Sequence, residues 1–113
     1  MSDAAVIKQV KIKTGVVKRL LKERVSYIKE AENETAKVQA MKAQASNEDE
    51  EYAAKKAEAV LQETRNMVGD AARRCATAAA ELRKLLEEAK LDPESQEAKD
   101  AQEQLGLCEG VVA

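Results

Sequence analysis

The residues Leu91-Asp92-Pro93-Glu94 hold the only proline of the 113-residue chain, and they decide where its helices divide. Proline fixes its own φ and lacks a backbone N–H, so it is tolerated in the first turn of a helix but not inside one. Asp92 is a residue type that caps helix N-termini. The turn therefore predicts that one helix ends near residue 90 and that a shorter one begins at Pro93.

Upstream of this turn, apolar residues recur at spacings of three, four and seven in two long stretches. This periodicity predicts one buried stripe on each of two helices, over about residues 3–45 and 47–90. The first stripe comprises Val6, Val10, Val17, Leu20, Leu21, Ile28, Ala31, Val38 and Met41. Between the two stretches, Ser46 followed by Asp49 is typical of a capping box, and it predicts the start of the second helix at Ser46.

Downstream of the turn, a third stripe predicts a helix over about residues 93–109. Its members are Ala98, Ala101, Leu105, Cys108 and Val112, at spacings of three and four. Short connections make neighbouring helices antiparallel. The sequence therefore predicts an all-α fold in a single domain, 1–113: an antiparallel three-helix bundle with left-handed, coiled-coil-like packing. The third helix should cover the N-terminal half of the first and the C-terminal half of the second, which leaves residues 38–60 as a two-helix hairpin.

The composition argues against catalysis. Aromatic residues make up 2% of the chain and histidine is absent, which removes the commonest general base and metal ligand. Ser26 and Ser95 consequently lack a histidine to activate them. No Gly-rich phosphate loop or EF-hand spacing occurs. The sequence predicts a protein that is not an enzyme, with no catalytic residue, no metal site and no cofactor. Without a long apolar run or a signal-like N-terminus, it also predicts a soluble, cytoplasmic protein.

The predicted pairing of helices brings two sets of residues into register. Cys75 and Cys108 are equidistant along the chain from the turn after residue 91, so they should lie at the same height. Two buried thiols are the favoured interpretation, and a redox switch is the alternative. Gly15 falls opposite Ala78, which indicates either a close approach of two backbones or a surface glycine.

Charge is distributed unevenly along the chain. Residues 1–24 carry seven Lys or Arg and two acids, whereas residues 91–113 carry one Lys and six acids. One helical face holds Lys8, Lys11, Lys18, Lys22 and Lys29, with Arg19 beside it. These cations either form ion pairs with acids of the third helix or meet an acidic protein partner. The net charge of −2 and the scarcity of aromatics argue against nucleic acid, and the lack of a second apolar face argues against a membrane.

Two stretches of the chain resemble the tubulin-folding cofactor A (tubulin-specific chaperone A) family. They are residues 9–31, most specifically Lys11 to Leu20, and residues 61–74, with Met67-Val68-Gly69-Asp70 and Arg73-Arg74. The resemblance implies a non-catalytic three-helix chaperone of the cytoplasm and cytoskeleton. Such a protein captures and holds free β-tubulin after the chaperonin, without nucleotide, and passes it on within the pathway of tubulin-folding cofactors. A generic coiled-coil scaffold that forms a homodimer is the alternative.

The expected tubulin-binding residues combine this resemblance with shared charge. They are Lys11, Lys18, Arg19, Lys22, Arg65, Asp70, Arg73 and Arg74. The chain departs from the family at Gly69, where the family typically has proline. Because glycine keeps its N–H and adds no ring, we expect a straighter or softer second helix there, with partner binding retained.

Overall fold

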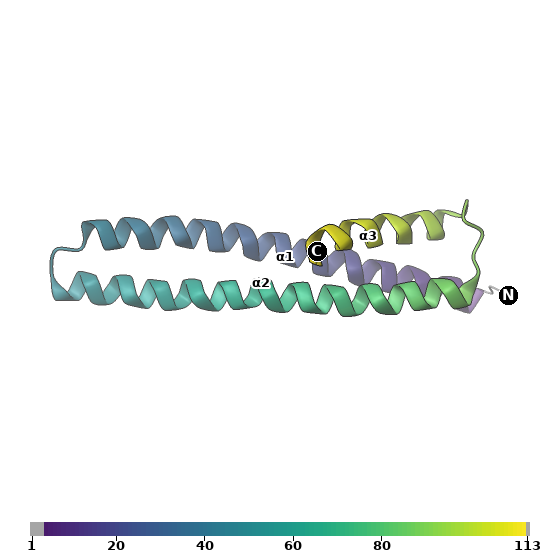
Figure 1. Ribbon diagram of the computed structural model, residues 1–113, viewed down its shortest axis with the longest axis horizontal. Helices are drawn as coiled ribbons and strands as arrows, with labels where there is room; N and C mark the ends of the chain where they lie inside the picture. The colour runs from purple at the N-terminus through teal and green to yellow at the C-terminus, as the bar shows by residue number, and fades with distance from the viewer. Residues whose placement is uncertain (1–3, 113) are drawn as a thin grey trace. The chain divides into compact units, whose positions relative to one another are not determined.

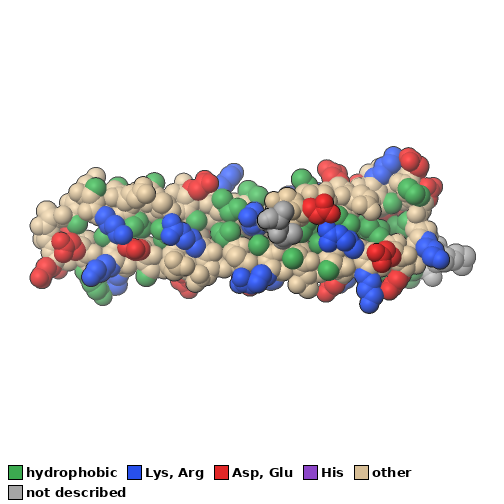
Figure 2. Space-filling view, viewed as in Figure 1, with side chains coloured by type: hydrophobic (Ala, Val, Ile, Leu, Met, Phe, Trp, Pro, Cys, Tyr) green, Lys and Arg blue, Asp and Glu red, His purple; other side chains and the backbone are tan. Residues whose placement is uncertain are grey.

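The computed structural model describes residues 4–112, and three helices form its regular structure (Figure 1). Helix α1 spans Ala4–Gln44, α2 spans Glu48–Ala89 and α3 spans Gln96–Val112. The predicted all-α class, with two long helices and a shorter third, is confirmed. Charged side chains of both signs are interspersed over the face that Figure 2 displays. No helix among the described residues has the length and apolar character needed to cross a bilayer.

The chain divides into two compact units. The first combines residues 1–23 with 71–113, and the second comprises residues 24–70. The first unit thus contains the N-terminal part of α1, the C-terminal part of α2 and all described residues of α3. The second contains only the remaining parts of α1 and α2. This division agrees with the predicted placement of α3, and the two-helix part is longer than the predicted 38–60, since it spans residues 24–70. The assignment of one domain to the whole chain stays a prediction.

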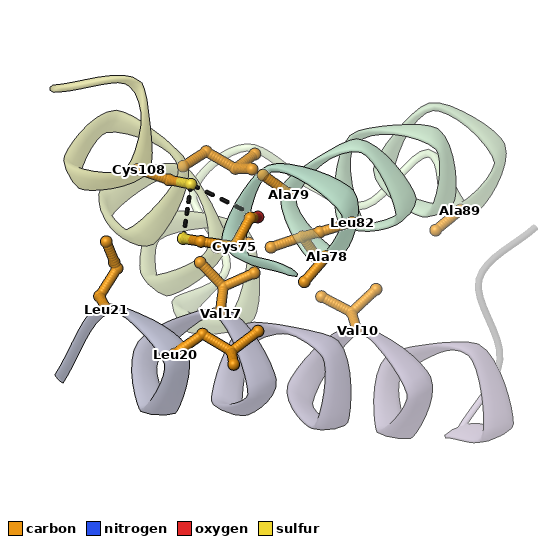
Figure 3. Close-up of a cluster of buried hydrophobic side chains, with 12 residues drawn as sticks. Val10, Val17, Leu20, Leu21, Cys75, Ala78, Ala79, Leu82, Ala89 and Cys108 are labelled. Carbon is orange, nitrogen blue, oxygen red and sulfur yellow. Dashed lines mark hydrogen bonds between the residues drawn. The ribbon is translucent and has the colours of Figure 1, made fainter. Parts of the chain in front are cut away.

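The first unit buries a narrow core to which all three helices contribute (Figure 3). Val10, Val17 and Leu82 are among its fully buried side chains. The cluster comprises Val10, Val17, Leu20, Leu21, Cys75, Ala78, Ala79, Leu82, Ala89, Ala101, Leu105 and Cys108. Alanine and cysteine supply half of it, and such small side chains let helices pack at short distance without aromatic filling.

The second unit buries far fewer side chains. Of its described residues, only Val38, Ala54, Leu61 and Thr64 are buried. The Thr64 hydroxyl donates to the Val60 carbonyl at 3.2 Å, which satisfies the one buried polar group among them. On the surface, the Lys42 ammonium hydrogen-bonds to the Glu58 carboxylate at 2.6 Å and lowers the pKa of that carboxyl. The pairing of α1 with α2 here rests on a thin seam.

The start of α2 is capped by Asn47, so the prediction of Ser46 at the N-cap is wrong by one residue. The Asn47 Oδ1 accepts the backbone N–H of Glu50 at 2.9 Å. The Ser46 hydroxyl instead donates to Glu50 Oε1 at 2.8 Å, and its backbone N–H donates to the same oxygen at 3.1 Å. These bonds favour the ionised carboxylate and lower the pKa of Glu50. Asparagine caps as well as serine does, so sequence preference alone does not separate the two.

Helix α2 ends at Ala89 through a left-handed residue. Lys90 has φ 50°, and its N–H donates to the Leu86 carbonyl at 3.3 Å. This bond is the single five-to-one bond of an αL cap, a position usually taken by glycine. Helix α2 is thus terminated at Lys90, three residues before Pro93.

Helix α3 begins at Gln96, three residues later than predicted. The Ser95 hydroxyl accepts the N–H of Ala98 at 3.3 Å and is the N-cap. Asp92 instead closes the preceding turn, where its carbonyl accepts the N–H of Ser95 at 2.9 Å. Pro93 therefore lies in the turn rather than in the first turn of the helix. The physical reason is that two capping residues compete here, and the later one places its hydroxyl at the N-terminus of α3.

Gly15 is a surface glycine, so the interpretation as a close backbone approach is wrong. Gly15 is exposed, and a Cβ built on it meets no atom within 4 Å. Ala78, its predicted counterpart, is buried in the core of the first unit. Gly15 therefore lies on the solvent side of α1 and not in its seam with α2.

Candidate functional site

One exposed face of α1 carries a concentration of positive charge. We call Lys8, Lys11, Lys18, Arg19 and Lys22 the cationic face; all five are exposed and belong to the first unit. Their spacings of three, four and seven place them along one side of the helix, with Gly15 among them. No acidic side chain interrupts α1 between Ala4 and Lys22. The face therefore presents five cations without an acid of its own helix.

The cations of this face form no ion pair among the described residues. On α3, Glu109 contacts Arg83 of α2 at 3.3 Å, and Glu94 in the turn before α3 contacts Lys99 at 3.4 Å. The lysine of this part of α1 that does pair with α2 is Lys13, which lies outside the cationic face and contacts Glu81 at 2.9 Å. The interpretation that the cationic face is neutralised by the third helix is therefore wrong. Its charge is available to another molecule.

An apolar row runs beside the cationic face. Ile12, Val16 and Leu20 follow one another at intervals of four on α1, and the Ile12 side chain is 47% exposed. Val16 and Leu20 also line a groove of about 310 Å³ between α1 and α2, to which α3 contributes no residue. The other lining residues are Arg73, Arg74, Thr77, Ala78 and Glu81. Apolar surface flanked by guanidinium groups is typical of protein interfaces.

The expected binding residues fall into both units. Arg73 and Arg74 are exposed and border the groove of the first unit, where Arg74 Nη2 lies 3.7 Å from Glu23 Oε2. Arg65 and Asp70 belong to the second unit and are also exposed. The first unit thus brings together six of the eight expected residues: Lys11, Lys18, Arg19, Lys22, Arg73 and Arg74.

In the second unit, Arg65 borders a separate groove. This groove also measures about 310 Å³, and its other lining residues are Ile28, Ala31, Glu32, Thr35 and Val68. Its walls are mostly apolar, as in the first unit. A candidate surface is therefore present in each unit.

Ile12 and Val16 are absent from the expected set, although the sequence contains a signal for them. Both lie off the apolar stripe that runs through Val10 and Val17. An apolar residue outside the apolar stripe of its helix points in a different direction from the stripe, so it lies to one side of the packed seam. Ile12 and Val16 therefore extend the candidate surface beyond its charges.

The described residues contain no group of three or more His, Cys, Asp or Glu side chains that could hold a metal ion. What the first unit offers instead is a row of exposed cations on α1 beside a groove between α1 and α2. Charges at the rim of an interface steer association and select partners, whereas apolar contacts at its centre supply affinity. The arrangement suits an acidic protein partner.

Comparisons with known proteins agree with this geometry. Residues 5–105 match the family model described as tubulin binding cofactor A. The chain is 47% identical over 95 residues to tubulin-specific chaperone A of Rattus norvegicus, covering 84% of this chain and 85% of that protein.

Two solved structures are similar as well. The crystal structure of tubulin folding cofactor A from Arabidopsis thaliana superimposes with a TM-score of 0.84 at 37% identity, covering 96% of this chain and 99% of that one. The human tubulin chaperone cofactor A structure gives a TM-score of 0.72 at 42% identity, covering 89% and 95% of the two chains.

Proposed function

Since this chain belongs to the tubulin binding cofactor A family, we propose that it is a chaperone that captures and holds free β-tubulin during tubulin folding. It acts after the chaperonin, uses no nucleotide and catalyses no reaction. It works in the cytoplasm, associated with the cytoskeleton, and other tubulin-folding cofactors receive the subunit from it. Its relatives are named for tubulin folding, and the family model covers most of the chain.

The unpaired cationic face of α1 is the observation that supports a binding role most directly. Lys11, Lys18 and Lys22 are exposed and have no acidic partner among the described residues. An acidic surface of β-tubulin would be attracted to this face, while the apolar row through Ile12 would contact side chains that the free subunit leaves uncovered. Arg19, Arg73 and Arg74 extend the same surface, and Arg65 and Asp70 provide further contacts from the second unit.

The test is a native-gel titration with β-tubulin freshly released from chaperonin, alongside intact α/β-tubulin heterodimer. We expect a complex with the free subunit only. The double variant Lys18→Glu/Lys22→Glu should weaken the complex on the order of tenfold or more, since two attractive contacts become repulsive. It should also flatten the dependence of affinity on salt, because fewer attractive charges remain to be screened.

Lys37→Glu/Lys55→Glu is the matched control. Both lysines are exposed in the second unit, and the substitution changes the net charge by the same amount. If the two double variants lose affinity equally, net charge and not the cationic face governs binding. Unchanged affinity and salt dependence in Lys18→Glu/Lys22→Glu would contradict the proposed surface, and a chain that binds neither form of tubulin would contradict the proposed function.

A second function is a dimerisation module, and exposed apolar side chains of the second unit favour it. Val25, Tyr52, Val60 and Met67 are 50%, 62%, 53% and 42% exposed, respectively. Burial of these side chains against a second copy would add apolar contacts to a thin core. Sedimentation equilibrium from low to high micromolar concentration shows whether the chain is a monomer or forms a dimer. A mass that rises with concentration supports the module, and a constant monomer mass excludes it.

A further inference from the structure

The two cysteines of the chain lie against each other inside the first unit. Cys75 projects from α2 and Cys108 from α3, and their Sγ atoms are 2.8 Å apart (Figure 3). Neither forms a disulfide, and both are buried, with 0% and 1% exposure. The Cys108 thiol also donates to the Cys75 carbonyl at 3.5 Å. A disulfide has sulfurs about 2.05 Å apart, so only a small side-chain adjustment separates this contact from a bond.

We propose that Cys75 and Cys108 form a site of reversible disulfide modification, with an oxidised low-molecular-weight disulfide such as glutathione disulfide as the oxidant. The Cys108 thiolate attacks one sulfur of glutathione disulfide, forms a mixed disulfide and releases one glutathione thiolate. The Cys75 thiolate then attacks Cys108 Sγ and displaces the second glutathione. The two cysteines lose two protons and two electrons, and glutathione disulfide takes up both.

Helix α3 supplies the route by which the buried thiols meet the oxidant. Cys108 lies near the C-terminal end of α3, and Gly106 and Gly110 flank it at two residues on either side. A Cβ at either glycine would meet no atom within 4 Å, so neither glycine is required by packing. Each lowers the helix propensity of this segment relative to alanine. The end of α3 therefore opens at low cost, exposes Cys108 first, and recloses to bring the mixed disulfide against Cys75.

The product is a covalent link between α2 and α3 within one unit. The bond closes a loop between two cysteines that are 33 positions apart in the sequence. A cross-link of this length restricts the unfolded chain and holds the end of α3 on its seam. We expect the oxidised protein to unfold on the order of 10 °C higher than the reduced protein. This inference does not depend on tubulin binding, because every readout below uses the chain alone.

The experiment compares the reduced and the oxidised forms of the full chain. Reduced protein is equilibrated with mixtures of oxidised and reduced glutathione, quenched with acid, alkylated after unfolding and weighed by intact mass spectrometry. We expect a monomer that has lost two hydrogen atoms, takes up no alkylating reagent, and returns to the dithiol with dithiothreitol. A persistent glutathione adduct, a disulfide-linked dimer or two free thiols at every ratio would each overturn the proposal.

Two sets of variants test the mechanism. In Cys75→Ala, the mixed disulfide at Cys108 should accumulate, and oxidation should no longer raise the unfolding temperature. In Gly106→Ala/Gly110→Ala, oxidation should slow on the order of tenfold, since a more stable helix end opens less often. Gly15→Ala is the matched control on another helix and should oxidise at the wild-type rate. An unchanged rate in Gly106→Ala/Gly110→Ala would overturn the opening step.

Discussion

Whether a residue lies on the surface or in a seam between helices determines how its substitution affects stability. Gly15 is the clearest example. It lies in the interior of α1, it is exposed, and a Cβ there has open space. Gly15→Ala should therefore stabilise the protein by about 1 kcal/mol, because alanine restricts the unfolded chain and favours the helix.

Thermal and denaturant unfolding measure this gain. Ser26→Ala, at another exposed position in the interior of α1, is the control and should stabilise by less, since serine lies between glycine and alanine in helix propensity. A loss of stability in Gly15→Ala would show that the position is packed against something after all.

The location of a single residue can be predicted from the sequence when the residue belongs to the regular apolar stripe of its helix. It is predicted less well when the residue lies beside that stripe. The juxtaposition of Cys75 and Cys108 follows from counting along two antiparallel helices, and the 2.8 Å contact confirms it. Gly15 fails under the same counting, because height along a helix does not specify the direction in which a residue points. The binding role of Lys11 and Lys18 stays a prediction, since the chain alone cannot show what a surface contacts.

Of all features of the helices, their ends are predicted least accurately from sequence. The start of α2 allows a direct test of which residue is the N-cap. Asn47→Ala removes the side chain that accepts the Glu50 N–H, and it should cost about 1 kcal/mol. Ser46→Ala should cost less, because the Ser46 hydroxyl donates to a side chain and caps no backbone group. Chemical denaturation of both variants decides between the two caps; a larger loss in Ser46→Ala would restore the serine cap.

Two exposed carboxyl groups of α2, those of Glu50 and Glu58, should make the stability of the fold depend on pH. Hydrogen bonds from Ser46 lower the pKa of Glu50 below its ordinary value of 4.5, and the bond from Lys42 does the same for Glu58. A carboxyl whose pKa is lower in the folded state stabilises the fold fully above its unfolded pKa, and that stability is lost as pH falls through the folded pKa. The loss should therefore appear below pH 4.5 and be absent near neutrality.

Glu50→Gln is the variant that isolates this contribution. Glutamine keeps an accepting oxygen and cannot titrate, so the difference in unfolding free energy between wild type and Glu50→Gln should shrink as the pH is lowered from 7 toward 3. Urea unfolding at each pH measures it. A difference that is constant across this range would mean that the ionisation of Glu50 is not coupled to folding.

The helices themselves were predictable because their signal repeats many times, whereas each end depends on one or two groups. Long stripes such as the one through Leu61 and Leu82 fix α2 regardless of any single residue. By contrast, Ser95 rather than Asp92 caps α3, and the left-handed Lys90 ends α2 without a glycine. Competing caps differ by a fraction of a kcal/mol, which composition does not resolve.

Across the whole molecule, buried apolar area is distributed unequally, and local stability should follow it. The core cluster of the first unit comprises twelve buried residues, whereas four described residues of the second unit are buried. Each buried aliphatic side chain contributes roughly 1.5–3 kcal/mol. Amides around Leu61 should consequently exchange with solvent through openings of lower free energy than those around Leu82, which should exchange only on global unfolding.

Hydrogen exchange at increasing denaturant tests this difference. Slowly exchanging amides of α1 near Val17 and of α2 near Leu82 should share one free energy of exchange, and amides near Val38 and Leu61 should show a lower one. Equal values in both units would contradict the prediction. The last turns of α3 are left out of the comparison, because Gly106 and Gly110 lower their protection for a separate reason. A second unit that opens more readily would let Arg65 and the apolar groove beside it adapt to a partner, whereas the cationic face would stay on a rigid support.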